Sequence, residues 1–123
     1  MGTLEVRRTN TILYCRRWTE TVQFYRDVLG LAGHWLSGWF VEFRLGAESF
    51  VGIADAARAT IAPANGAGIT LSWQLDDLDG FHRYLADKGV TPGPITTRWG
   101  ARCFYFQDPE GHRLEAWAAG ERS

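Results

Sequence analysis

Long apolar segments and frequent cysteines are both missing from this sequence. No apolar run reaches the roughly 18 residues that a membrane-spanning helix needs, and no secretory signal segment is recognisable. We therefore expect a soluble protein of the cytoplasm with no membrane partner. The two cysteines, Cys15 and Cys103, are too few for a disulfide framework or a zinc-binding spacing, so we expect two reduced thiols.

An excess of positive charge is also missing. The 13 basic residues are outnumbered by 14 acidic ones, and the formal net charge is −1. Binding to nucleic acid phosphates requires Lys and Arg gathered on one face, and here the arginines are scattered along the chain. We expect no nucleic acid partner.

The length and composition fit one folded domain. The chain has 123 residues, of which 46% are hydrophobic and 22% are charged. A chain of this length buries about two thirds of the surface that it exposes when unfolded, which is enough for a core without disulfides or structural metals.

Two stretches of the chain show the same order of local patterns. In the first, a strand-like segment at residues 10–16 precedes Val22, Tyr25 and Leu29 at helical spacing, and Gly30 ends the predicted helix. The second begins with a strand-like segment at residues 69–75. An acidic cap, a helical apolar face and a final glycine follow it, at Asp76, Asp77, Leu78, Phe81, Leu85 and Gly89.

Each stretch continues with three more strand-like segments, at residues 35–38, 40–45 and 49–54 and at residues 94–97, 101–107 and 112–117. The sequence thus predicts a single α+β domain built from two tandem βαβββ repeats, residues 8–54 and 68–118. Residues 55–67, rich in Ala and Gly, form the predicted linker. We expect the repeats to form a curved mixed sheet around a cleft, where small ligands commonly bind.

Alternation along the strands predicts which side chains face this cleft. In the strand at residues 69–75 the odd-numbered positions are apolar and should pack under a helix, which leaves the polar positions for the cleft. The same rule applied to the other strands predicts a set of ligand-binding side chains: Phe40, Glu42, Phe50, Thr70, Ser72, Gln74, Cys103, Tyr105, Glu115 and Trp117. Trp35, Trp39 and Trp99 are expected to border the cleft.

Two segments resemble a known family. Residues 104–115 (FYFQDPEGHRLE) are similar to the C-terminal signature of the vicinal-oxygen-chelate superfamily, which includes glyoxalases, bleomycin-resistance proteins and dioxygenases. Residues 24–30 (FYRDVLG) are similar to its first helix, and the repeat extends the resemblance over nearly the whole chain. The resemblance implies the paired βαβββ fold.

The resemblance also implies where a metal would bind in the metal-dependent members. The ligand positions carry Asn10, Thr70 and Glu115 here, and the position of a possible further carboxylate falls near Gly52. One carboxylate with two neutral oxygens is a poor site for a first-row metal, so we expect no metal and no cofactor, and we include Asn10 among the ligand-binding residues. His34, His82 and His112 are expected to lie on the surface.

Three functions are compatible with these observations. The first is a metal-free protein that binds or sequesters an aromatic or amphipathic compound such as an antibiotic, as the resemblance to resistance proteins implies and the six tryptophans favour. The second is a metal-free enzyme in which Glu115, in an apolar pocket, acts as general acid or base. The third is a metal-dependent lyase, dioxygenase or thiol transferase with an unusual ligand set. In each case the resemblance implies a homodimer.

Overall fold

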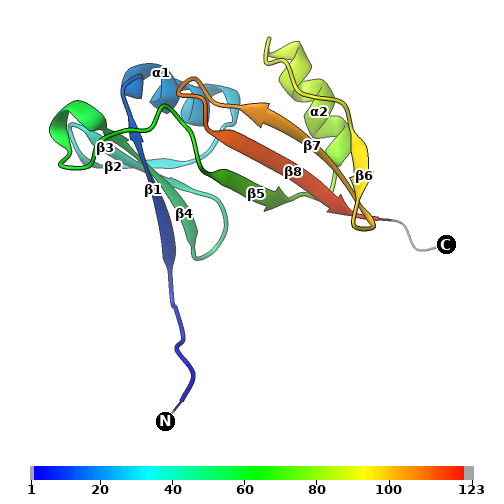
Figure 1. The fold of residues 1–123 in the computed structure, drawn as a ribbon, viewed down its shortest axis with the longest axis horizontal. Coiled ribbons are helices and arrows are strands. Elements are labelled where there is room, and N and C mark those ends of the chain that lie inside the picture. The colour runs from blue at the N-terminus through cyan, green and yellow to red at the C-terminus, as the bar shows by residue number, and fades with distance from the viewer. Residues whose placement is uncertain (1, 121–123) are drawn as a thin grey trace. The chain divides into compact units, whose positions relative to one another are not determined.

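The computed structural model describes residues 2–120, and it divides the chain into two compact units that meet between Ala64 and Asn65 (Figure 1). Each unit contains one strand, one helical segment and three further strands, in that order. The predicted α+β class and the two βαβββ repeats are thereby confirmed. None of the helices in the described part of the chain has the length and apolar character needed to cross a membrane.

The first unit forms a four-stranded mixed sheet. Its elements are strand β1 (Thr9–Cys15), helix α1 (Trp18–Gln23), the π-helical turn η1 (Phe24–Val28) and strands β2 (Gly33–Ser37), β3 (Phe40–Arg44) and β4 (Ser49–Asp55). The strands lie in the order β1-β4-β3-β2, with β1 parallel to β4 and the other pairs antiparallel. A short 3-10 helix η2 (Ala56–Arg58) follows β4, where the sequence predicted the start of a linker.

The helical segment of the first unit departs from the regular helix that the sequence predicts. Leu29 donates its backbone N–H to the carbonyl of Phe24, which is the wider spacing of a π turn. The two adjacent aromatic residues Phe24 and Tyr25 are both buried, and the ring of Tyr25 stacks on Phe43 at a centroid distance of 5.8 Å. Both rings enter the core of the unit from this turn.

The second unit repeats this arrangement. Its elements are strand β5 (Thr70–Gln74), helix α2 (Leu78–Asp87) and strands β6 (Thr96–Arg98), β7 (Ala101–Gln107) and β8 (Arg113–Ala119), with the strand order β5-β8-β7-β6. Asp77 caps α2 by accepting the backbone N–H of Gly80 at 3.0 Å. On the predicted apolar face of the helix, Phe81 packs against Phe104 and Phe106 at centroid distances of 6.0 Å and 5.7 Å.

In each unit the helix covers one face of its sheet. The side chains on that covered face are buried, as those of Val41, Val51 and Ile53 illustrate in the first unit and Phe104 and Leu114 in the second. We call the other face of each sheet its open face. Within residues 2–120 the side chains of Cys15 and Cys103 are buried and form no disulfide, and their reduced state stays a prediction.

Candidate functional site

Three cross-strand rows of side chains make up the open face of the second unit. Strand β5 pairs with β8 so that Thr70 lies beside Arg113, Ser72 beside Glu115 and Gln74 beside Trp117. Strand β7 continues all three rows, with Gln107 beside Arg113, Tyr105 beside Glu115 and Cys103 beside Trp117. The rows therefore carry a cation, an anion and a large aromatic ring in succession. The face assignment predicted from alternation is confirmed for these strands, and ligand binding by them stays a prediction.

Glu115 occupies the middle row and is already hydrogen-bonded from both sides. The hydroxyl of Ser72 donates to its Oε1 atom at 2.5 Å. The hydroxyl of Tyr105 also donates to it, and this hydrogen bond is the main reason why the pKa of Tyr105 is raised, with desolvation and the negative charge of Glu115 adding to it. Tyr105 is thus held protonated at neutral pH as a donor to the carboxylate.

The hydrogen bond between Tyr105 and Glu115 leads to a testable pH dependence. We expect the pKa of Tyr105 to fall in Glu115→Gln, because the substitution removes the negative charge that opposes ionisation of the phenol. It should rise in Arg98→Gln, because the charge of Arg98 acts in the opposite direction. NMR of the tyrosine Cζ carbons during a pH titration measures both pKa changes. An unchanged pKa of Tyr105 in Glu115→Gln would show that Tyr105 does not donate a hydrogen bond to Glu115.

Arg113 is a residue of this face that the sequence reasoning left out of the ligand-binding set. Its Nε atom donates to Thr70 Oγ1 at 2.8 Å, and its guanidinium carbon lies 4.6 Å from the centre of the Tyr105 ring. Arg113 and Thr70 also line a cavity of about 420 Å³ together with Gly66, Gly68 and Ile69. Alternation with Glu115 along the last strand was the signal that could have identified Arg113.

On the open face of the first unit, the carboxylate of Glu42 is neutralised by neighbouring side chains. Arg8 forms an ion pair with it, and Asn10 Nδ2 donates to its Oε2 atom at 2.7 Å. The guanidinium of Arg8 also lies 3.8 Å from the centre of the Phe50 ring, and the ring of Phe40 covers Gly52, which has no side chain. Glu42 is only 7% exposed, and its ion pair with Arg8 is therefore part of the structure of this unit.

The tryptophans do not all lie where the sequence predicted. Trp35 pairs with Val41, so it points to the helix-covered face, and its ring contacts Trp18 edge-on at a centroid distance of 5.8 Å. The prediction that Trp35 borders the ligand site is wrong, because face parity on β2 depends on a cross-strand register that local pattern does not reveal. Trp39 stacks on Phe40 at 6.3 Å, and Trp99 is fully exposed in the turn between β6 and β7.

All three histidines were predicted to lie on the surface, but one is buried and a second is partly covered. The ring of His82 packs edge-on against Phe104, and its Nε2 atom lies 2.9 Å from the carbonyl oxygen of Gly93. His112 is 4% exposed, and its Nδ1 atom lies 2.8 Å from Asp108 Oδ2. His34 is exposed on β2. The rings of His82 and His112 are covered by residues that the fold brings next to them. The local sequence does not predict this burial.

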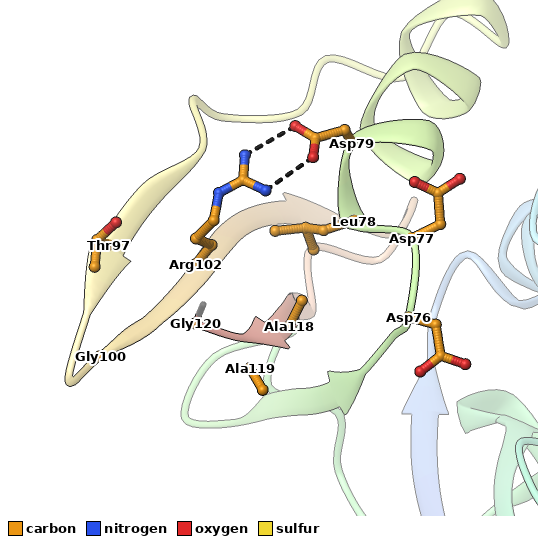
Figure 2. Close-up of a pocket in the computed structure, with 10 residues that line it drawn as sticks. All are labelled: Asp76, Asp77, Leu78, Asp79, Thr97, Gly100, Arg102, Ala118, Ala119 and Gly120. Atoms are coloured by element: carbon orange, nitrogen blue, oxygen red, sulfur yellow. Dashed lines mark hydrogen bonds and ion pairs between the residues drawn. The ribbon is translucent and has the colours of Figure 1, made fainter. Parts of the chain in front are cut away.

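A second cavity of the second unit, of about 720 Å³, lies where α2 begins (Figure 2). Arg102 makes two hydrogen bonds of 2.8 Å to Asp79, which lower the pKa of that carboxyl group. Thr97 and Arg102 pair on the face that α2 covers, so this cavity is separate from the open face. Its lining holds three aspartates and no aromatic side chain, which makes it a poor match for an apolar ligand.

Two βαβββ units, each with an open sheet face that carries a carboxylate, make up the described part of the chain. The chain matches the Glyoxalase/Bleomycin resistance protein/Dioxygenase superfamily over residues 8–116 and belongs to that family. No curated protein sequence gives a significant match.

Solved structures share the fold at low sequence identity. A lactoylglutathione lyase from Agrobacterium tumefaciens is 23% identical, with a TM-score of 0.73 over 89% of this chain and 91% of that one. A glyoxalase/bleomycin resistance protein/dioxygenase from Nocardioides is 21% identical, with a TM-score of 0.79 over 100% and 89%. The oxidase ChaP-H2 is 23% identical, with a TM-score of 0.68 over 98% of both chains.

The residues at the family's metal-ligand positions do not fit a metal. Asn10 is bonded to Glu42, and Thr70 accepts a hydrogen bond from the guanidinium of Arg113, whose positive charge would repel a cation beside it. Within residues 2–120 no three His, Cys, Asp or Glu side chains gather into a group that could hold a metal ion.

Proposed function

We propose that this chain binds an aromatic or amphipathic small molecule, such as an antibiotic, and releases it unchanged. The observation that carries the proposal is the open face of the second unit, where the half-buried Trp117 lies one row from Glu115 and its two hydrogen-bond donors. A flat apolar surface beside a few oriented polar groups is the usual composition of a small-molecule site.

The chemistry of Glu115 favours binding over catalysis. A general base must have a lone pair directed at the proton that it removes. Here the hydroxyls of Ser72 and Tyr105 both point at the carboxylate, which suits a fixed acceptor that orients a ligand.

Binding can be tested with the uncharged fluorescent probe N-phenyl-1-naphthylamine. We expect Trp117→Ala to weaken its affinity about 10-fold, because stacking and apolar burial on the indole are lost together. Trp35→Ala is the matched control, since Trp35 is half exposed on the helix-covered face and should leave the affinity unchanged. Equal effects of the two substitutions would contradict the assignment of the site to the open face.

The second candidate function is a metal-free enzyme that uses Glu115 as general acid or base. It is favoured by the position of this carboxylate at the centre of the face, beside the neutral proton donor Tyr105. Recovery of a bound aromatic compound after long incubation separates the two functions. A changed compound with the wild-type protein, and an unchanged one with Glu115→Gln, would establish the enzyme in place of the binding protein.

We also propose a homodimer. Strand β2 is an edge of its sheet, all five of its residues are exposed, and Trp35 and Leu36 are each 50% exposed there. An uncovered apolar edge strand tends to associate, and a second copy would cover it. Sedimentation velocity should therefore give a dimer that Leu36→Lys weakens, and a monomer at all concentrations would contradict this proposal.

A further inference from the structure

The cavity of Gly66, Gly68, Ile69, Thr70 and Arg113 lies at the cationic end of the open face of the second unit. Its volume of about 420 Å³ is within the range of small-molecule sites. Gly66 and Gly68 both have φ angles of +82°, and a Cβ added at Gly68 would meet nothing within 4 Å. The glycines thus leave this wall of the cavity without side chains, and the charge in it comes from Arg113.

Arg113 is oriented by two contacts that leave most of its donors available. Its Nε–H donates to Thr70 Oγ1 at 2.8 Å, and its guanidinium carbon lies over the Tyr105 ring, 4.6 Å from the ring centre. Among the described residues no carboxylate pairs with Arg113 and no acceptor engages its two terminal nitrogens. A guanidinium whose plane is fixed and whose terminal N–H groups are free matches the paired oxygens of an oxyanion.

Other arginines of the protein show the contrast. Arg8 is paired with Glu42, and Arg102 forms a two-pronged pair with Asp79, so the charge of each is used within the fold. Arg113 is exposed and contacts Thr70 and Tyr105, but no carboxylate neutralises it. This combination of an oriented guanidinium and a cavity is what distinguishes Arg113 from a solvated surface arginine.

We propose that this cavity binds an oxyanion group, a carboxylate, sulfonate or phosphate, of the same aromatic ligand, with Arg113 as the residue that recognises it. The inference rests on the proposed function, because the ligand would extend along β8 from Trp117 to Arg113. These residues are four positions apart, which corresponds to about 13 Å along a strand. The ligand class is therefore an elongated aromatic acid.

The negative charge of Glu115 lies one row from the proposed oxyanion, and it does not prevent binding. The hydroxyls of Ser72 and Tyr105 donate hydrogen bonds to the Glu115 carboxylate. Arg113 lies in the neighbouring row, where the oxyanion would bind. A donor group in the middle of the ligand, such as a phenol or an amine, would find its acceptor in Glu115. The open face would thus bind the aromatic end of the ligand at Trp117 and its oxyanion end at Arg113.

Two fluorescent probes with the same aromatic skeleton test the inference. 8-Anilino-1-naphthalenesulfonate carries a sulfonate, and N-phenyl-1-naphthylamine lacks it. We expect Arg113→Gln to weaken the sulfonate about 10-fold or more and to leave the neutral probe within about twofold, because hydrogen bonds to charged groups are the strong ones. Arg113→Lys should restore part of the affinity. Arg83→Gln removes the same charge from the exposed side of α2, the helix that covers the opposite face of the sheet, and is the matched control.

The outcomes separate this inference from the proposed function. Selective loss of the sulfonate in Arg113→Gln, with Arg83→Gln unchanged, supports the oxyanion site. Equal loss in both variants would overturn it, because the effect would then be general electrostatic attraction. If the wild-type protein binds the neutral probe and Arg113→Gln weakens neither, only the oxyanion site fails. If the protein binds neither probe, the proposed function fails with it.

Discussion

Asp108→Ala should lower the free energy of unfolding by about 3–5 kcal/mol. The side chain of Asp108 is fully buried, and its Oδ1 atom accepts the backbone N–H groups of Glu110, Gly111 and His112, each at 3.0 Å. Its Oδ2 atom bonds to the imidazole of His112 at 2.8 Å. Removing the carboxylate leaves buried donors without an acceptor. Urea denaturation followed by circular dichroism measures the loss.

Asp77→Ala is the matched control for this prediction. Asp77 is an exposed aspartate that accepts one backbone N–H, that of Gly80, at the start of α2. Loss of such a cap typically costs about 1 kcal/mol. The difference between the two aspartates tests the role of the buried turn, and a similar small loss in both would show that residues 108–112 do not depend on this carboxylate.

Gly66→Ala should be the second large destabilisation, of about 3 kcal/mol. A Cβ at this position would lie 2.3 Å from the backbone carbon of Gly111 and 2.5 Å from the nitrogen of His112, and backbone atoms cannot move aside as a flexible side chain can. The positive φ of +82° adds the cost of placing alanine in the left-handed region. Thermal and urea unfolding of the variant measure the sum.

Gly68→Ala isolates the contribution of the backbone angle. Gly68 has the same φ of +82°, and nothing lies within 4 Å of an added Cβ. We expect a loss of about 1–2 kcal/mol from the conformation alone. If Gly66→Ala were no worse than Gly68→Ala, the close approach of the two turns would not exist in solution.

These two predictions concern the same part of the molecule as the proposed oxyanion site. The turn held by Asp108 packs against Gly66, and Gly66 is one wall of the cavity that Arg113 lines. The segment that resembles the family signature therefore has two functions in the structure. Its buried aspartate fixes the turn, and the strand that follows the turn carries Arg113, Glu115 and Trp117 on the open face.

Local pattern was enough to predict which face each central strand of the second unit presents. Apolar and polar residues alternate in β5 and β8, and the cross-strand rows of Ser72 with Glu115 and Gln74 with Trp117 follow from that alternation. Trp35 was expected at the border of the cleft from the position of its strand segment, not from alternation. It lies on an edge strand whose register shifts between Trp35 and Ser37, and an irregular strand loses the period of two that alternation needs.

The sequence by itself determined the repeated βαβββ order, the α+β class, the family and the parity of the regular strands, because each depends on spacing along the chain. Only the tertiary structure decided which side chains meet: Arg8 with Glu42, Thr70 with Arg113, and Asp108 with His112 across its turn. Arg8 precedes β1 and reaches Glu42 on β3, and Thr70 on β5 meets Arg113 on β8. The pair of Asp108 and His112 depends on a buried turn. Such contacts are set by long-range pairing and burial, which spacing along the chain does not encode.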